Sequence, residues 1–233
     1  MVDGQTYDSY ERLTVRCLQM TDTKTRVMDS AERLFAERGF AATSLRDITA
    51  DAGVNLAAVN YHFGTKEALL SAVFDRRFGP INQERLELLD AAECRAEGAA
   101  LDLEEILRFF LLPPFAKMQE WGDAGPNFIR LVGRAHSDTN EQTRASFLRP
   151  FEGIVSRYEV ALRRALPNLD RAELRWRLHF VIGAMAHTMA WCQMMKTPGR
   201  RRGAPPEIVQ EALVRFVSAG MRAPASDRGG ETS

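Results

Sequence analysis

Residues 53–70, GVNLAAVNYHFGTKEALL, combine hydrogen-bonding side chains with an unusually small helix face. Asn55 and Tyr61 offer donors and acceptors, whereas Ala57 and Ala58 carry only methyl groups. Exposed helix faces are usually rich in Lys and Glu, so a face of this kind suits close approach to another surface. Asn can form two hydrogen bonds with adenine, and a small methyl can contact the methyl group of thymine. The chemistry predicted here is recognition of base edges in duplex DNA.

Three short helices are predicted to position this face. They cover 24–38, 45–52 and 56–62, with Gly39 and Gly53 in the turns, where glycine permits a positive φ. A glycine-bearing turn between the second and third helices indicates a helix-turn-helix. In that motif the later helix lies in the major groove, with its N-terminal side chains at base edges.

Polar residues stand where these helices should begin. Thr43 or Ser44 can cap the second helix, Asn55 the third, and Thr65 a fourth helix that begins near Lys66. We expect phosphate contacts at the edges of the motif, from Thr43, Tyr61, His62 and Lys66.

The rest of the sequence predicts more helices, separated by short interruptions. Gly79-Pro80 should bend or break the fourth helix, and Pro113-Pro114 should end a later one. Strand-like alternation does not occur in the sequence, so the predicted fold class is all-α. The further helical patterns cover 86–92, 101–112, 127–135, 141–166, 171–196 and 207–221, with a loop over 197–206.

This pattern predicts a helix-turn-helix DNA-binding domain joined to a helical ligand-binding and dimerisation domain. We assign a flexible leader to 1–22, the first domain to 23–70, the second to 71–223 and a disordered tail to 224–233. Met20 is an alternative start.

Composition narrows the function classes. Lys plus Arg equal Asp plus Glu at 31 each, which argues against a nonspecific polybasic binder. The sequence has neither a signal-peptide pattern nor an apolar run of 18 residues, so we expect a cytoplasmic protein without a membrane partner. Cys17, Cys94 and Cys192 lie too far apart to indicate a zinc site. No HExxH, GxSxG or phosphate-loop motif is present, so we expect no catalysis, metal or cofactor.

Residues 31–74 resemble the N-terminal domain of TetR-family transcriptional regulators. The matching features are LFAERGF, the T-S-x-x-x-I-x-x-x-A-G-V block and the Y-H-F-G-T-K-E-x-L close. Asn60 stands where many members carry Tyr, which favours a base contact at this position. The resemblance implies that Thr43, Tyr61 and Lys66 bind phosphate and that Asn55, Leu56, Ala57, Ala58 and Asn60 face the groove.

A helix-turn-helix needs a second copy to reach two half-sites about one DNA turn apart. The segment 171–195 is apolar around most of its circumference, so it should be buried on several sides. We predict a homodimer whose interface is a four-helix arrangement of 171–195 and 206–221; a monomeric core is the alternative. The last helix would contribute Ile208, Leu213, Val217 and Phe216.

The middle helices are predicted to enclose a hydrophobic effector. Arg130 and Arg134 lie one turn apart and could hold a carboxylate or phosphate. Ordinary core packing and surface ion pairs would explain the same residues. The predicted ligand-binding residues are Phe110, Phe115, Phe128, Arg130, Arg134, Phe147, Phe151, Met185 and Met189.

A closer resemblance links the chain to fatty-acid-responsive regulators of the PsrA type. It is carried by NLAAVNYHF, FIRLVGRAHSD and WRLHFVIGAMAHTM, in that order. The resemblance implies a repressor that binds a palindromic operator and is released by a long-chain fatty acid or acyl-CoA. Two rival interpretations remain: a regulator that responds to an aromatic drug-like ligand, and a ligand-binding protein without a DNA function.

Overall fold

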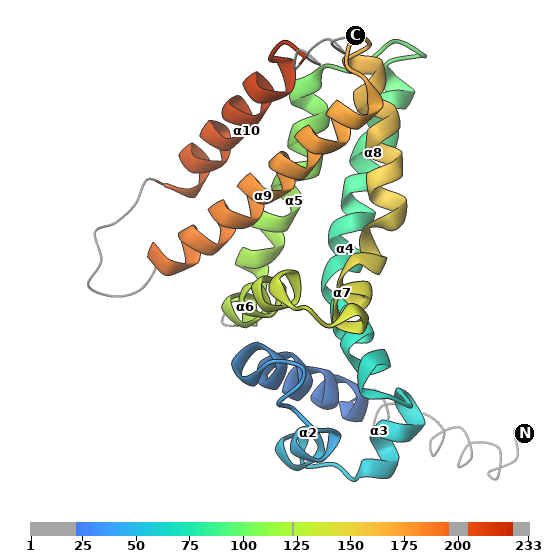
Figure 1. The fold of residues 1–233 in the computed structure, drawn as a ribbon, viewed down its shortest axis with the longest axis vertical. Helices are drawn as coiled ribbons and strands as arrows, with labels where there is room; N and C mark the ends of the chain where they lie inside the picture. The colour runs from blue at the N-terminus through green and yellow to red at the C-terminus, as the bar shows by residue number, and fades with distance from the viewer. Residues whose placement is uncertain (1–21, 123, 196–204, 226–233) are drawn as a thin grey trace, which may run out of the picture. The chain divides into compact units, whose positions relative to one another are not determined.

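The computed structural model describes residues 22–122, 124–195 and 205–225, and the regular elements in these ranges are helices (Figure 1). The all-α prediction is confirmed. The predicted leader, apart from Asp22, and most of the predicted 197–206 loop and C-terminal tail lie outside the described residues. The helices are residues 22–38, α2 (Leu45–Ala52), α3 (Leu56–His62), α4 (Lys66–Arg95), α5 (Leu103–Glu120), α6 (Ala124–Ser137), α7 (Glu141–Leu148), the short 3-10 turn η1 (Arg149–Phe151), α8 (Glu152–Ala165), α9 (Arg171–Met195) and α10 (Pro206–Arg222).

The chain divides into two compact units. The first contains the chain up to Arg77 together with Arg130–Arg149, and the second contains Phe78–Ile129 and the chain from Pro150 onward. Helix α4 therefore contributes residues to both units, as does α6.

The first unit has an apolar core made by the predicted helical stripes. Buried residues from the 22–38 helix pack with Ile48 of α2, Val59 of α3 and the start of α4. A buried carboxylate, Glu32, forms ion pairs with Arg77 at 2.7 Å and Arg76 at 2.8 Å, which tie the first helix to α4. The core members are Val27, Ala31, Leu34, Phe35, Ile48, Ala52, Val59, Leu69, Leu70, Val73 and Phe74.

The second unit is built from helices that pack pairwise around one core. Helix α5 packs against α8 and α10, and α9 packs against the same two helices (Figure 1). The core draws Leu89 from α4, Ile106 from α5, Leu162 from α8, Leu178 from α9 and Val214 from α10. Apolar surface buried by all five helices therefore stabilises this unit.

Three predicted boundaries were wrong, and each involves proline. Helix α4 does not break at Pro80, where a bend or a break was predicted, and α5 runs through Pro113-Pro114, where a helix was predicted to end. Proline removes one backbone hydrogen bond, but Phe78 and Ile81 near Pro80 are buried, and Pro113 and Pro114 are themselves in the α5 core face. Conversely, the single helix predicted over 141–166 is interrupted by η1, which contains Pro150.

No helix in the described part of the chain is long and apolar enough to span a membrane.

Candidate DNA-binding surface

The turn between α2 and α3 depends on one glycine. Gly53 has φ +63°, and a Cβ at this position would lie 3.0 Å from an Arg26 guanidinium nitrogen. That guanidinium donates to the carbonyls of Ala52 and Gly53, at 2.5 and 3.2 Å, which fixes the end of α2 to the first helix. Both the left-handed backbone and the close approach of Arg26 therefore favour glycine.

Side-chain caps define where α2 and α3 begin. Ser44, one of the two predicted caps, forms a capping box with Asp47: its hydroxyl accepts from the Asp47 amide at 3.1 Å, and the Asp47 carboxylate accepts from the Ser44 amide. The predicted Asn55 cap is also confirmed, since its side-chain oxygen accepts from the Ala58 amide at 2.8 Å. The start of α3 is thus held rigidly.

The surface of α3 is exposed, small and free of acidic side chains. Leu56, Ala57 and Asn60 are exposed, Ala58 is half-buried, and Tyr61 is 75% exposed. Val59 on the opposite side is completely buried and fixes α3 to the unit. His62 is half-buried, with its ring centroid 5.2 Å from that of Tyr61. This face can enter a groove without removing any core contact.

Thr43 and Lys66 have internal partners. Thr43 is 1% exposed, and its hydroxyl donates to the Gly39 carbonyl at 2.8 Å. The Lys66 ammonium donates to the Phe40 and Thr43 carbonyls, each at 2.9 Å, and lies 4.2 Å from the centroid of the Phe40 ring. These contacts stabilise the turn before α2. Phosphate binding by the two side chains stays a prediction without support from this geometry.

Most acidic side chains of the first unit are occupied by internal partners. Asp51 pairs with Arg33, and this hydrogen bond lowers the pKa of Asp51. The bond from the Ser44 hydroxyl likewise lowers the pKa of Asp47. Ion pairs with arginine therefore offset negative charge that would repel DNA, whereas Asp47 is bonded to the neutral Ser44 and keeps its charge. The acids with partners are Asp22, Asp29, Glu32, Glu37, Asp47, Asp51, Asp75 and Asp138.

One candidate phosphate contact, Arg46, was not predicted from the sequence. Arg46 is exposed on α2, and its side chain forms no hydrogen bond or ion pair with any described residue. The sequence could have indicated this contact, because α2 was predicted to be the first helix of the motif. That helix crosses the DNA backbone.

The predicted ligand-binding residues do not form a single group. Phe110, Phe115, Met185 and Met189 lie together in the core of the second unit. Two others pack on Phe78 of the same unit, with ring centroids 5.0 Å away for Phe128 and 4.5 Å away for Phe151. In the first unit, Phe147 packs on Phe74 at 5.6 Å.

The two predicted head-group arginines belong to the first unit and are exposed. Arg134 donates to the Glu37 carbonyl at 3.0 Å, in the last turn of the first helix. Cationic side chains stabilise helix C-termini, so this contact explains Arg134 without a ligand. A buried cation in the second unit, Arg85 of α4, was not considered in the sequence analysis, although it stands at helical spacing between Ile81 and Leu89, both buried.

Large apolar side chains remain exposed on α9 and α10. On α9 they follow one stripe, Trp176, Phe180 and Trp191, and on α10 they include Ile208 and Phe216. This confirms that α9 has more apolar residues than one core stripe requires. Leu213 and Val217, predicted to contribute to a dimer interface, are instead buried in the core of their own unit.

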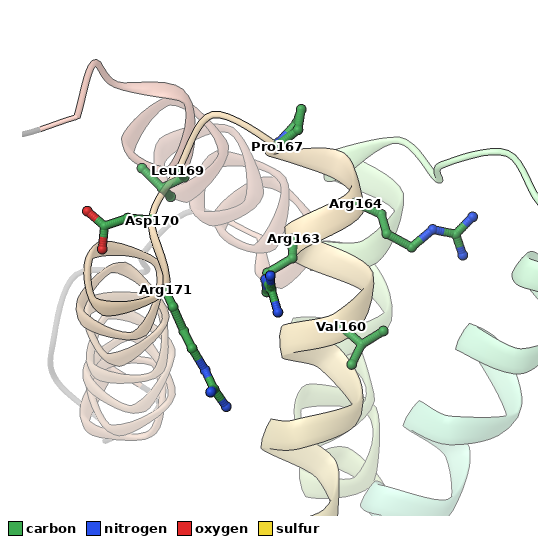
Figure 2. Close-up of a pocket in the computed structure, with 7 residues that line it drawn as sticks. All are labelled: Val160, Arg163, Arg164, Pro167, Leu169, Asp170 and Arg171. Atoms are coloured by element: carbon green, nitrogen blue, oxygen red, sulfur yellow. The ribbon is translucent and has the colours of Figure 1, made fainter.

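A surface pocket of about 480 Å³ lies at the turn from α8 to α9 (Figure 2). Arg163 and Arg171 extend toward the space between the two helices, whereas Arg164 points away from it. Arg171 is paired with Glu159 at 2.7 Å, and Arg164 donates to the Gly98 carbonyl at 2.6 Å. None of the predicted ligand-binding residues lines this pocket.

Two family models match separate parts of the chain. The model for bacterial regulatory proteins of the TetR family matches residues 27–73, and the model for the tetracyclin repressor-like C-terminal domain matches residues 108–220. Together the two matches cover more than half of the chain and include the helix-turn-helix and most of the second unit. The chain belongs to the TetR family.

Curated relatives match over a short part of the chain. A helix-turn-helix transcriptional repressor of Mycobacterium tuberculosis, Rv3405c, is 55% identical over 49 residues, which are 21% of this chain and 26% of the relative. The regulator TtgR of Pseudomonas putida is 41% identical over 54 residues, 23% of this chain and 26% of the relative. The chain therefore matches only about a quarter of the length of these relatives.

Solved structures match the fold over most of the chain. The fatty acid degradation regulator FadR of Bacillus halodurans superposes with a TM-score of 0.60 at 17% identity, covering 86% of this chain and 96% of that protein. The FadR of Bacillus subtilis, solved with stearoyl-CoA, gives 0.58 at 16% identity, covering 84% and 98%. At these identities the similarity shows a shared fold.

Proposed function

We propose that this chain is a TetR-type transcriptional repressor that binds a palindromic operator as a homodimer and is released by an acyl effector. The observation that carries the proposal is the face of α3, which is exposed, small and nearly uncharged although the helix is firmly capped and anchored. A solvent-facing helix has no structural need for such a face, whereas a helix in the 12 Å major groove does.

The DNA contacts divide by chemistry. Asn60, with Ala57 and Ala58 on the same helix, would meet base edges, because their side chains allow the backbone to approach closely. Tyr61 and His62 would contact phosphates from the edge of α3, and Arg46 would do so from α2. Asn55 and Leu56, at the start of α3, would face the major groove. Asn55 would also remain the N-cap of α3.

Dimerisation is supported by the exposed stripes of α9 and α10. Trp176, Phe180 and Phe216 are each at least 60% exposed, and contiguous apolar surface of this kind marks an interface in a soluble protein. Gly183 and Ala186, also exposed on α9, would allow two copies of the helix to pack closely. A twofold pair would present two α3 helices to two half-sites.

The effector is proposed to bind in the second unit, where Phe110, Phe115, Met185 and Met189 form an apolar, deformable core. The stearoyl-CoA bound to the FadR of Bacillus subtilis motivates the ligand class. To change the ratio of the released to the DNA-binding conformation from 1:99 to 99:1, the effector must bind the released conformation about 5.5 kcal/mol more tightly. An acyl chain offers about 0.8 kcal/mol per buried CH₂, so chain length can supply this difference. We infer that α4, which belongs to both units, transmits the change.

The test measures fluorescence anisotropy of an inverted-repeat duplex taken from DNA upstream of the gene. We expect tight binding, with a logarithm of the binding constant that falls linearly as the logarithm of the salt concentration rises. Tyr61→Ala should lose about tenfold in affinity through a lost charge-assisted hydrogen bond, whereas Leu148→Ala, an exposed apolar control in the same unit, should not. Equal affinity for the repeat and a scrambled duplex would refute the proposal.

A further inference from the structure

Arg85 is a buried cation in the core of the second unit. It lies on the apolar face of α4, one turn after Ile81 and one turn before Leu89, and it is 1% exposed. Tyr158 from α8 covers the same turn, with its hydroxyl donating to the Arg85 carbonyl at 2.9 Å. Charged side chains are almost never buried this deeply unless they are paired.

The Arg85 guanidinium has fewer hydrogen-bond acceptors around it than it has N–H groups. Its Nε donates to the Phe110 carbonyl at 2.8 Å, and Nη1 donates to the Asn82 side-chain oxygen at 3.1 Å. Nη2 reaches only the Met185 sulfur, at 3.7 Å, and a thioether is a weak acceptor. A guanidinium has five N–H groups. One N–H on each terminal nitrogen therefore has no acceptor among the described residues.

The charge of Arg85 is also uncompensated. No carboxylate in the described part of the chain forms an ion pair with it, and its only cation-specific contact is the Phe110 ring, 4.3 Å from the guanidinium carbon. Burial lowers the pKa of Arg85 to about 10, so the side chain remains charged near neutral pH.

Arg177, the other buried arginine of the second unit, shows how this fold satisfies such a group. It pairs with Glu173 at 2.9 Å and donates to four backbone carbonyls at the end of α10, between Gly220 and Pro224. Both terminal nitrogens of Arg177 bond to oxygen. Arg85 has no carboxylate partner, and its three acceptors are two oxygens and one sulfur, so the two sites differ in the way expected of a structural arginine and a ligand-binding one.

We propose that Arg85 binds the carboxylate of the effector, which is therefore a free fatty acid rather than an acyl-CoA thioester. This inference rests on the proposed function and names the chemical class of its ligand. A carboxylate accepts one N–H from each terminal nitrogen in a bidentate pair, which matches the two N–H groups without acceptors. A thioester carbonyl has no charge to compensate the cation.

The surroundings of Arg85 suit an acyl chain. A carboxylate on the two N–H groups without acceptors would lie beside the Met185 sulfur, the weakest of the three present acceptors. Met185 and Met189 lie one turn apart on α9, and Phe115 and Met118 of α5 belong to the same core. Unbranched methionine side chains can adopt new rotamers around a flexible ligand, so the alkyl chain can enter this core as the head group reaches Arg85.

The experiment compares myristate, methyl myristate and myristoyl-CoA by calorimetry on the full chain without DNA. The wild type should bind myristate about tenfold to a hundredfold more tightly than the methyl ester, as expected for a charged hydrogen-bonded pair. In Arg85→Met this ratio should fall to about one. Arg130→Met, the same substitution at the exposed arginine predicted from sequence, should keep the wild-type ratio.

Arg85→Lys provides a second variant should Arg85→Met fail to fold by circular dichroism. Lysine keeps the charge but not the planar fork, so the ratio should fall part of the way. A ratio that survives in a folded Arg85 variant, or is lost in Arg130→Met instead, overturns the assignment. So does a wild type that prefers myristoyl-CoA.

Operator binding separates this inference from the proposed function. A chain that binds the operator but no acyl ligand would overturn Arg85 as a carboxylate site and leave the DNA function in place. A chain that binds myristate through Arg85 but no operator would support the carboxylate site and contradict the repressor.

Discussion

At the scale of single residues, the absence of bulk on α3 is as informative as any charged group. Ala57 and Asn60 are exposed on a helix whose other side is anchored by the buried Val59. The ion pair of Asp51 with Arg33 offsets one of the negative charges of the first unit. Close approach of the α3 backbone to a base edge is the property that these residues share.

Ala57→Glu tests this property directly. The longer, negatively charged side chain should clash with the groove and repel phosphates, lowering operator affinity by about 1–3 kcal/mol, the usual effect of a disrupted base contact. Since Ala57 is exposed, the free energy of unfolding should change by less than about 0.5 kcal/mol. Ala91→Glu, at an exposed position of α4 in the second unit, is the control, and equal affinities of the two variants would count against the α3 contact.

A second residue-scale prediction concerns pH. The hydrogen bond from Arg222 lowers the pKa of Glu104 from 4.5 to about 2, so the folded state favours the ionised carboxylate. This stabilisation is present above pH 4.5 and is lost as pH falls toward 2. Glu104→Gln should therefore lower the melting temperature at pH 7, and the difference from wild type should shrink below pH 4.5. Glu207→Gln, on the exposed first turn of α10, should show no such trend; a constant difference at Glu104 would contradict the ion pair's role.

At the scale of elements, the sequence predicts best where a side chain acts on its own backbone. The ends of α2 and α3 were predicted to the residue, because caps at Ser44 and Asn55 and the turn at Gly53 are local features. Pro80 and Pro113 were misjudged, because burial of the surrounding helix face is a tertiary effect that outweighs one missing hydrogen bond.

The predicted binding site shows the same limit. The exposed face of α3 follows from helical periodicity, so its residues could be proposed from sequence. The partners of Lys66 and Arg134 are backbone carbonyls of residues 23 to 97 positions away, and no local pattern indicates such contacts. Arg85 was recognisable only as a break in an apolar stripe, and its missing carboxylate partner required the packed core.

The junction between the first helix and α4 depends on the buried Glu32. Glu32→Ala leaves Arg76 and Arg77 without their shared carboxylate and should reduce the free energy of unfolding by about 3 kcal/mol, as expected for a broken buried pair. Asp29→Ala removes an exposed carboxylate from the same Arg76 and should change it by less than about 1 kcal/mol. Urea titration followed by circular dichroism measures both, and comparable losses would show that burial of Glu32 is unimportant.

At the scale of the whole molecule, the proposed function requires two copies, since one α3 helix would read one half-site. The exposed aromatic residues of α9 and α10 are the candidates for the contact between the two copies. Phe216 is the most exposed of them on α10, at 73%, and its burial in a dimer would supply hydrophobic stabilisation.

Phe216→Glu should therefore yield a monomer at micromolar concentration in sedimentation velocity, because a charge would be buried at the interface. Operator affinity should fall by about a hundredfold or more, because the two helix-turn-helix motifs are no longer linked. Val160→Glu introduces the same charge at an exposed apolar site on α8 and should remain dimeric. A dimeric Phe216→Glu would place the interface elsewhere.

Hydroxyl-radical footprinting of the gene's upstream DNA tests the central claim, groove recognition by paired α3 helices, most directly. The account predicts two protected segments on one face of the duplex, related by an inverted repeat and centred about one helical turn, ~34 Å, apart. Both should disappear with Ala57→Glu. Protection of a single segment, uniform protection without sequence preference, or a footprint unchanged by Ala57→Glu would contradict it.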